Sequence, residues 1–354
     1  MTTAAVPDLV DLPKVELHLH IEGTLEPELI FELAERNGLR LPYSEVAELR
    51  ARYKFADLAD FLALYYDNMS VLVEDVDFYD LAWAYLARAG AEGLRHAEIF
   101  FDPQAHMARG VPIEAVLAGL GEATRSSERD LGVSSGLIAN FLRDRPSEEA
   151  AATLSQLLRS GVPLLGVGLD SAEVGNPPSR FAALFDQARA AGLHCVAHAG
   201  EEGPPEYVWE ALDLLRVERI DHGVRSMEDA ALVGRLRERG TPLTVCPLSN
   251  VVLGGFASMA DHPIVAMLDA GLAVTVNSDD PAYFGGYVGE NYRQVATTFG
   301  LDRASLARLA GNAVEAAFVS PGRRGELRAE LSRWEEGPEA GLAPAAPVAG
   351  QGGS

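Results

Sequence analysis

Short apolar runs alternate with longer amphipathic stretches along most of the chain. Eight of these runs have the length of buried strands, at residues 14–21, 95–101, 134–141, 164–169, 194–198, 219–222, 243–246 and 273–277. Between them, apolar residues recur at helical spacing in stretches such as 147–160, 180–191, 206–215, 227–239 and 262–270. Eight strand-then-helix units predict a single (β/α)8 TIM barrel. The alternative, a doubly wound open sheet, would more often carry a Gly-rich phosphate turn after its first strand, and this sequence has none there.

The segment after the first strand is longer than a plain strand-to-helix connection needs. Residues 39–93 read mainly as helical. Part of this segment shows the i, i+3, i+4, i+7 spacing of a packed helix face, at Leu58, Phe61, Leu62 and Tyr65. We therefore expect extra helices inserted after the first strand, beside the mouth of the barrel.

The sequence indicates one domain, a C-terminal tail and a cytoplasmic location. The 354 residues suit one large domain, which we place at residues 1–336. Residues 337–354 are rich in Ala, Pro and Gly without periodicity and are predicted to be a disordered tail. Cys195 and Cys246 form no CxxC pair, which fits a reducing cytoplasm. We read neither a signal peptide nor a membrane span, so we expect a cytoplasmic protein.

The net charge of −23 narrows the class of partner. Such a charge repels polyanions and works against the binding of DNA or RNA. A small neutral substrate is easier to reconcile with it. The sequence leaves the oligomeric state open.

The first strand ends in a histidine pair. His18 and His20 are separated by one residue, so their side chains lie on the same face of the strand, roughly 6.6 Å apart along the backbone. Two imidazoles at that spacing can bind one metal ion, although such a pair also occurs without one. The glycine at Gly23 allows a sharp turn, and Thr24 is expected to cap a helix over residues 25–37.

Three later strand ends carry polar residues of the same kind. His198 and Glu201 follow the fifth strand, and His222 ends the sixth. Asp279 and Asp280 follow the eighth strand, where neighbouring side chains diverge. Each group alone could be structural, but a barrel brings its strand ends together around one axis. The sequence therefore predicts a joint metal site.

The types of ligand favour one catalytic zinc ion. Three histidines and a carboxylate, with room for water, are typical of an open hydrolytic zinc site. A common type of two-metal barrel hydrolase needs a carboxylated lysine near the fourth strand, and the only lysines are Lys14 and Lys54. The other histidines lack such partners in the sequence and are expected to be packing or surface residues: His96, His106, His194 and His262.

The sequence resembles the adenosine/adenine deaminase family over about residues 12–315. The motifs are PKVELHLHIEG at 13–23, HAGEEG at 198–203, DHG at 221–223, CPLSN at 246–250 and SDDP at 278–281, in the order of the family. Within the family it is most similar to the adenine deaminases of bacteria and fungi, through HLHIEGTLEP, GLDSAEVG and DPAYFGGY. Adenosine deaminases typically carry Asp at the position of Glu22 and Gly at that of Asp221.

The resemblance implies a zinc ion, with Fe²⁺ as the alternative, bound once per chain. Its ligands would be His18, His20, His198 and Asp279. A hydroxide on that metal would attack C6 of adenine, giving hypoxanthine and ammonia in purine salvage.

The resemblance also implies roles for the residues around the metal. Glu201, in its protonated form, would donate to N1, while His222 would orient the water and, with Asp279, help to accept its proton. Asp280 would accept a hydrogen bond at the N7 side of the purine. Ser171 would lie where the main chain meets the purine.

Glu22 would favour the free base. Its longer side chain would occupy the space of a ribose and pair with the N9 hydrogen of adenine.

Two other functions remain open from the sequence. The chain could deaminate adenosine or an N6-substituted purine, or it could be a metal-binding barrel without turnover. Glu201 argues against the second, because a pure binding site needs no proton donor.

Overall fold

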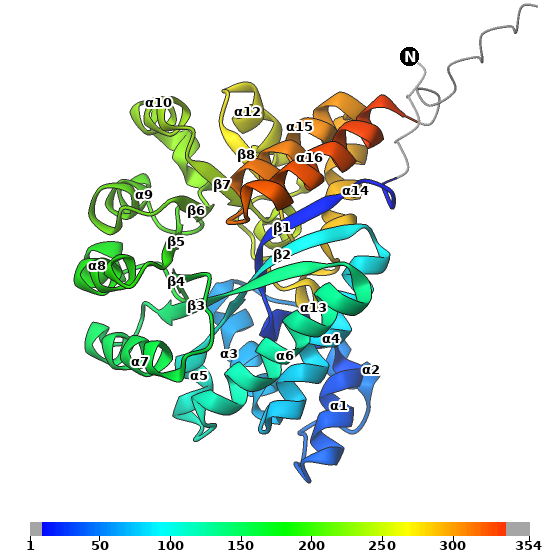
Figure 1. The fold of residues 1–354 in the computed structure, drawn as a ribbon, viewed down its shortest axis with the longest axis vertical. Coiled ribbons are helices and arrows are strands. Elements are labelled where there is room, and N and C mark those ends of the chain that lie inside the picture. The colour runs from blue at the N-terminus through cyan, green and yellow to red at the C-terminus, as the bar shows by residue number, and fades with distance from the viewer. Residues whose placement is uncertain (1–8, 338–354) are drawn as a thin grey trace, which may run out of the picture.

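Eight parallel strands form one sheet in the order of the sequence, from β1 to β8. The structure is a computed structural model that describes residues 9–337. Figure 1 shows the strands at the centre of the molecule and the helices around them. The strands are β1 Lys14–His20, β2 Leu94–Phe101, β3 Ser134–Leu142, β4 Gly166–Asp170, β5 His194–Ala199, β6 Arg219–His222, β7 Pro242–Val245 and β8 Ala273–Val276. The predicted (β/α)8 barrel is confirmed, and each predicted strand lies within two residues of an observed one.

The barrel closes between β1 and the residues that follow β8. The main-chain N–H of His20 donates to the carbonyl of Asp279 at 3.0 Å, and the N–H of Asp279 donates to the carbonyl of His18 at 3.2 Å. These bonds attach the end of the first strand to the turn after the last. Two groups of predicted site residues are thereby fixed to each other through the backbone.

Sixteen α-helices lie in the described part of the chain. They are α1 Pro27–Arg36, α2 Val46–Arg50, α3 Leu58–Asn68, α4 Asp75–Ala91, α5 Pro103–Ala108, α6 Ile113–Leu131, α7 Ser147–Ser160, α8 Ala182–Ala190, α9 Pro205–Glu210, α10 Ala230–Arg239, α11 Pro247–Val252, α12 Ile264–Asp269, α13 Pro281–Phe284, α14 Val288–Phe299, α15 Arg303–Ala316 and α16 Pro321–Glu336. Helices between later strands pack their apolar faces on the outside of the barrel, for example at Leu154 and Leu157 of α7.

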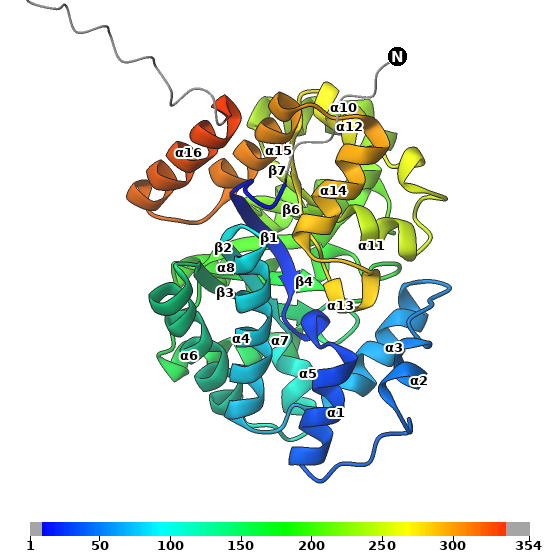
Figure 2. The ribbon, with the colours of Figure 1, turned by 90° about the vertical axis from the view of Figure 1, so that its right-hand side faces the viewer.

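Four of these helices, α1 to α4, lie between β1 and β2. Figure 2 shows α1, α2 and α3 near the carboxyl end of β1, far from α16 at its other end. The predicted apolar face of α3 is buried at Leu58, Phe61 and Tyr65, whereas Leu62 is half-buried. This helix therefore lies with its apolar face toward the strand ends.

The predicted helix over residues 25–37 is present as α1, but the prediction that Thr24 caps it is wrong. Helix α1 begins at Pro27, whose fixed φ and missing N–H suit a first helical position. Residues Glu22–Thr24 form a short 3₁₀ turn instead, in which the Thr24 hydroxyl donates to the carbonyl of Ile21 at 2.7 Å. The chain thus makes one tight turn before the helix starts.

The interior of the barrel is filled by side chains. Phe100, Ile138 and Val196 pack against one another from three strands. Arg219 of β6 and Glu98 of β2 form a fully buried ion pair at 2.6 Å. The barrel is therefore a packed core and not an open channel.

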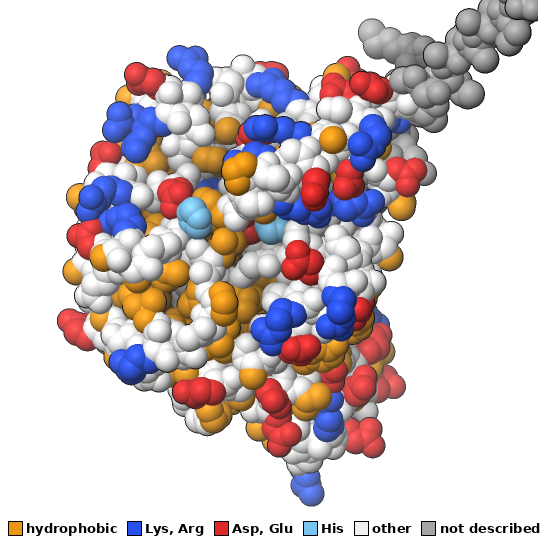
Figure 3. All heavy atoms as spheres, viewed as in Figure 1, with side chains coloured by type: hydrophobic (Ala, Val, Ile, Leu, Met, Phe, Trp, Pro, Cys, Tyr) orange, Lys and Arg blue, Asp and Glu red, His pale blue; other side chains and the backbone are white. Residues whose placement is uncertain are grey.

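Three further expectations concern membrane spans, surface charge and the C-terminal tail. Within residues 9–337, no helix is long and apolar enough to cross a membrane. Figure 3 shows acidic and basic side chains interspersed over one face of the molecule. The predicted tail, apart from Gly337, lies outside the described residues.

Candidate functional site

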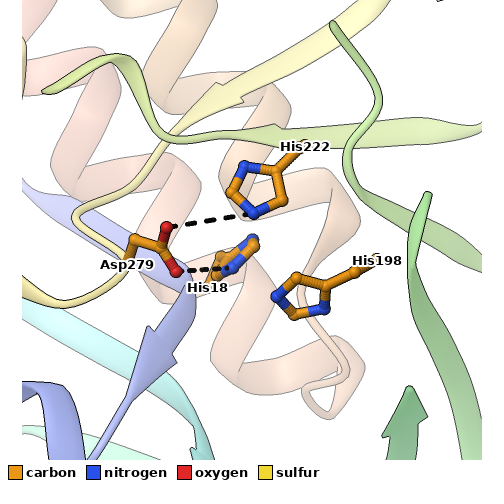
Figure 4. Close-up of side chains that lie close together, drawn as sticks. All are labelled: His18, His198, His222 and Asp279. Atoms are coloured by element: carbon orange, nitrogen blue, oxygen red, sulfur yellow. Dashed lines mark ion pairs between the residues drawn. The ribbon is translucent and has the colours of Figure 1, made fainter. Parts of the chain in front are cut away.

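Four strand ends bring donor atoms to one point. The ring nitrogens of His18, His198 and His222 and a carboxylate oxygen of Asp279 lie within 4.8 Å of one another, and all four residues are buried. Figure 4 shows these side chains pointing toward a common centre from different strands. The convergence expected from a barrel is therefore present in the structure.

His20 reaches the same centre from beside His18. Its Nε2 lies 3.1 Å from Nε2 of His198 and 3.5 Å from Oδ1 of Asp279. Its Nδ1 points the other way, 3.6 Å from Oδ2 of Asp170. Both histidines of the predicted pair thus face the cluster.

The spacing of these atoms fits a small metal ion. Ligand atoms around a tetrahedral zinc ion, at 2.0–2.1 Å from it, are roughly 3.3 Å from each other. The separation of His18 Nε2 from Asp279 Oδ1 is 3.1 Å, and the two separations made by His20 Nε2 are similar. Nε2 of His18 is buried without a hydrogen-bond partner. A metal ion would satisfy this nitrogen.

The main chain is strained where the site residues leave their strands. Among the described residues, four that are not glycine have positive φ, and three of them are predicted site residues: Ser171 at 70°, His222 at 60° and Asp279 at 65°. Such conformations are costly for L-residues and persist only where the surrounding structure enforces them. Strain at three strand ends is therefore concentrated at this site.

Burial keeps most of the imidazoles neutral. It lowers the pKa of His20 to about 4 and that of His222 to about 3, and it lowers the pKa of His198 well below its usual value. His18 differs because the nearby carboxylates of Asp279 and Asp221 together outweigh the lowering effect of burial and raise its pKa. Neutral imidazole nitrogens are the form that binds metal ions.

Strand β7 fixes the orientation of His18. The hydroxyl of Thr244 donates to Oδ1 of Asp221 at 2.8 Å, so it can only accept from Nδ1–H of His18, at 3.0 Å. This arrangement leaves Nε2 of His18 free of hydrogen and aimed at the cluster. Asp221, one of the departures from adenosine deaminases, therefore supports a candidate ligand from behind.

A cavity opens onto the cluster. Its polar residues come from strand ends and its apolar residues largely from α3. The lining consists of His20, Leu58, Phe61, Leu62, Tyr65, Tyr66, Asp102, Asp170, Ser171, His198, Glu201, His222, Leu253, Asp279, Asp280 and Phe284. Asp102 and Asp170 were not predicted as site residues.

Glu201 lies in the cavity, and its pKa is raised well above its usual value, chiefly by burial and further by Asp279 and Glu173. Its Oε2 is 3.5 Å from Nε2 of His222. A carboxyl in this setting retains its proton at neutral pH and can act as a general acid.

A second carboxylate holds the turn that carries Glu201. The side chain of Glu173, almost fully buried, accepts hydrogen bonds from four successive main-chain N–H groups, those of residues 200–203, at 2.7–3.1 Å. A Cβ on Gly203 would lie 2.5 Å from Oε1 of Glu173. This glycine is therefore needed for the close approach, and Glu173 is a structural part of the site that the sequence analysis did not assign.

Asp280 and Ser171 also line the cavity, as predicted for substrate contacts. The pKa of Asp280 is raised by burial and by the neighbouring Asp279, and its Oδ1 has no partner. Ser171 lies within 3.4 Å of the Tyr66 hydroxyl. Asp280 packs directly against Gly23, where a Cβ would lie only 2.0 Å from Oδ1 of Asp280, so no larger residue fits at this position.

Glu22 is buried behind the cavity and is not among its lining residues. Its Oε1 accepts from Nε2 of His106 at 2.7 Å and from the main-chain N–H of Asp102 at 3.1 Å, whereas Oε2 has no partner. Arg109 donates to Nδ1 of His106, so the hydrogen of that ring lies on Nε2. The prediction that His106 lacks a partner among the site residues is wrong.

His262 is buried, as expected of a packing residue, and its Nε2 lies 3.2 Å from the side-chain oxygen of Asn250, a residue in contact with His222. The prediction of packing or surface roles also agrees with the structure for the other two histidines. His96 is buried against Ser134, and His194 stacks on Phe318 with its side chain partly exposed.

The sequence matches the adenosine deaminase family over residues 13–334. An adenine deaminase from Streptomyces coelicolor is 59% identical over 321 residues, which cover 91% of this chain and 94% of the relative.

Solved structures with the same fold include two informative relatives. The crystal structure of an adenine deaminase from Arthrobacter aurescens is 55% identical, with a TM-score of 0.91 over 92% of this chain and 99% of the other. An amidohydrolase from Burkholderia ambifaria, solved with bound zinc, is 29% identical, with a TM-score of 0.86 over 95% of this chain and 94% of the other.

Proposed function

Because the chain belongs to the adenosine deaminase family, we propose that it converts adenine and water to hypoxanthine and ammonia with the aid of a bound metal ion. The observation that carries this proposal is the cluster of histidine and aspartate donor atoms beside the buried carboxyl of Glu201. A donor cluster next to a proton donor is what hydrolytic removal of an amino group requires.

We propose one metal ion per chain, held by His18, His20, His198 and Asp279. His20 is favoured over His222 as a ligand because its Nε2 is 3.5 Å from the Asp279 carboxylate, against 3.9 Å for His222. Zinc is the proposed ion, by analogy with the zinc-bound amidohydrolase relative, and Fe²⁺ would suit the same donors. When bound, the ion supplies Lewis-acid activation of a water molecule.

Glu201 and Asp280 would recognise the two sides of the purine. The raised pKa of Glu201 supports a protonated carboxyl that donates its hydrogen to N1 while C6 takes up the oxygen of water. The raised pKa of Asp280 likewise supports a carboxyl that donates to N7, an acceptor in neutral adenine. This differs from the sequence-based expectation that Asp280 accepts there.

The remaining lining residues would orient the base and exclude water. Ser171, in its left-handed conformation, turns the main chain after β4 toward the cavity. Leu58, Phe61 and Leu62 of α3 supply an apolar cover. A covered pocket strengthens the hydrogen bonds inside it and keeps competing water out.

Selectivity for the free base would come from the acidic wall formed by Asp102 and Glu22. Asp102 lines the cavity with a buried, unpartnered Oδ1, and Glu22 stands directly behind it with an unpartnered Oε2. The N9–H group of adenine could donate to such a wall, whereas adenosine has a carbon on N9. A buried acceptor left unpaired costs about 1–3 kcal/mol or more, which favours adenine over adenosine.

Ammonia release from adenine by zinc-loaded protein tests the proposal. We expect turnover that is lost on removal of the metal and restored by zinc, with one ion per chain by elemental analysis. Turnover of adenosine or an N6-substituted purine alone would instead support the second candidate. Undiminished activity without metal, or two ions per chain at full occupancy, would contradict the metal assignment.

A further inference from the structure

A chain of hydrogen bonds runs from the main chain of α12 to His222. The N–H of Ile264 donates to Nδ1 of His262 at 3.1 Å. Nε2 of His262 lies 3.2 Å from Oδ1 of Asn250, and Nδ2 of Asn250 lies 3.3 Å from Nδ1 of His222. None of the first three residues lines the cavity, so the chain lies behind the site.

The starting point of this chain fixes the direction of every bond in it. A main-chain N–H can only donate, so Nδ1 of His262 accepts and its hydrogen lies on Nε2. That hydrogen is donated to Oδ1 of Asn250, and the amide nitrogen of Asn250 therefore faces His222. Nδ1 of His222 is then an acceptor, and its own hydrogen lies on Nε2.

The opposite orientation of the Asn250 side chain is excluded by the same groups. With the amide nitrogen turned toward His262, Nε2 of that ring would have to accept, and its hydrogen would move to Nδ1. Nδ1–H would then face the N–H of Ile264, donor against donor in a buried setting. Only one arrangement of hydrogens satisfies all four groups.

We infer that His262 and Asn250 are positioning residues that hold His222 as the tautomer with hydrogen on Nε2, so that His222 donates a hydrogen bond into the site. The inference rests on the proposed function for its catalytic meaning, but the tautomer itself follows from the hydrogen bonds alone. A neutral His222 that carries its hydrogen on Nε2 is not a metal ligand through that atom. It also cannot accept a proton there, in contrast to the role expected from the family resemblance.

The surroundings make this arrangement rigid. His222, Asn250 and His262 are all at most 3% exposed. Asn250 is held by its own main chain, which donates to the carbonyl of Cys246 at 3.0 Å and accepts from Phe256 at 3.2 Å. The ring of His262 is covered by Phe256. The donor on His222 is therefore pre-oriented toward Oε2 of Glu201 and Oδ2 of Asp279.

The tautomers can be measured directly in the zinc-loaded wild-type protein. Long-range ¹H–¹⁵N correlation spectra of ¹⁵N-histidine-labelled protein distinguish a protonated ring nitrogen from an unprotonated one. We expect His222 and His262 each to carry hydrogen on Nε2 alone, with the signals assigned from His222→Gln and His262→Gln spectra. Hydrogen on Nδ1 of His222, or a metal-bound Nε2, would overturn the inference whether or not adenine is deaminated.

The variant Asn250→Asp tests whether the tautomer of His222 matters for catalysis. A carboxylate has no hydrogen to give to Nδ1 of His222, so that ring should shift its hydrogen to Nδ1 and lose the donor in the site. We expect kcat for adenine to fall by roughly 10²–10³-fold, the usual effect of removing an oriented donor, with KM and metal content little changed.

Asn291→Asp is the matched control. Asn291 is a buried residue of α14 that bonds to main-chain groups of α11 and the turn before α14, outside the chain to His222. We expect it to leave the His222 spectrum and kcat unchanged. A normal His222 tautomer and normal kcat in Asn250→Asp would overturn the inference. An inactive wild-type protein with the expected tautomers would instead refute the proposed function and leave the inferred chain of hydrogen bonds unaffected.

Discussion

Glu201 is a carboxyl whose charged form is disfavoured by its surroundings. It is buried, close to Asp279, and its turn is held by Glu173. We expect Glu201→Gln, which keeps the shape and removes the titrating proton, to lower kcat by about 10²–10⁴-fold while the metal content persists.

Steady-state kinetics with elemental analysis on the same preparation checks this outcome. Glu202→Gln is the control, because Glu202 is the adjacent acidic residue and does not line the main cavity. A Glu201→Gln enzyme with near-normal kcat would remove Glu201 from the mechanism, and loss of metal would make it a ligand.

The pH dependence of the reaction follows from the same carboxyl. Burial raises the pKa of Glu201, so the active protonated form persists above the usual range of a glutamate and is lost as pH rises through the raised value. We therefore expect kcat/KM for adenine to decline on the alkaline side. The residual kcat/KM of Glu201→Gln should not show this decline. If the decline at alkaline pH is unchanged in that variant, it arises from the titration of another group.

At the scale of single residues, the sequence predicts those site residues that are histidines or carboxylates at the end of a strand. His18, His20, His198 and Asp279 are found in this way, and the structure brings them together. Asp102 and Asp170 follow the same logic and were overlooked, since each is an acidic residue at the end of a strand. The roles of His106 and His262 could not be seen, because their partners lie on other elements, and Glu22 is 84 residues from His106.

Among the elements, β7 supports β1 from across the sheet. Thr244 of β7 accepts from His18 of β1 and donates to Asp221 of β6. We expect Thr244→Val, which removes the hydroxyl and keeps the shape, to weaken metal binding by roughly 10–100-fold.

Chelator competition measures this change without reference to activity. Thr153→Val, at a buried threonine of α7 on the outer layer, is the matched control. Unchanged metal affinity in Thr244→Val would show that the orientation of His18 does not depend on the Thr244 hydroxyl and that the main-chain carbonyl of Thr244, 3.2 Å from Nδ1 of His18, is sufficient.

The limits of prediction differ between strands and connections. Strand positions follow from the burial of short apolar runs, and the predicted bounds differ from the observed ones by two residues at most. The start of α1 was missed because Pro27 sets it, whereas the argument from Thr24 considered only the capping residue. Gly23 lies in a tight turn, as predicted, but it also allows the close approach of Asp280, which no local pattern reveals.

For the molecule as a whole, carboxyl groups outnumber basic groups both in the full sequence and in the lining of the pocket. The net charge is −23, and Asp102, Asp170 and Asp280 line a cavity whose described lining contains neither Lys nor Arg. A nucleotide phosphate would find no cationic side chain to pair with there. We expect no detectable ammonia release from AMP under conditions in which adenine is deaminated, and comparable turnover of AMP would show that a lining without Lys or Arg does not exclude a phosphate.

The barrel as a whole was predictable because its repeat is visible in the sequence, and the depth of the cavity was not. Helix α3 covers the strand ends through contacts between segments far apart in the chain, such as the hydrogen bond between Asn68 and Tyr283 at 3.1 Å. Such contacts place α3 over the cavity, and no local pattern in the sequence reveals them.

The most direct test of adenine as the substrate compares kcat/KM for adenine and adenosine on one zinc-loaded preparation. Adenine is expected to be favoured by well over tenfold, because Asp102, backed by Glu22, presents an unpartnered oxygen to the cavity that the nucleoside cannot satisfy. An equal or higher kcat/KM for adenosine would contradict the assignment.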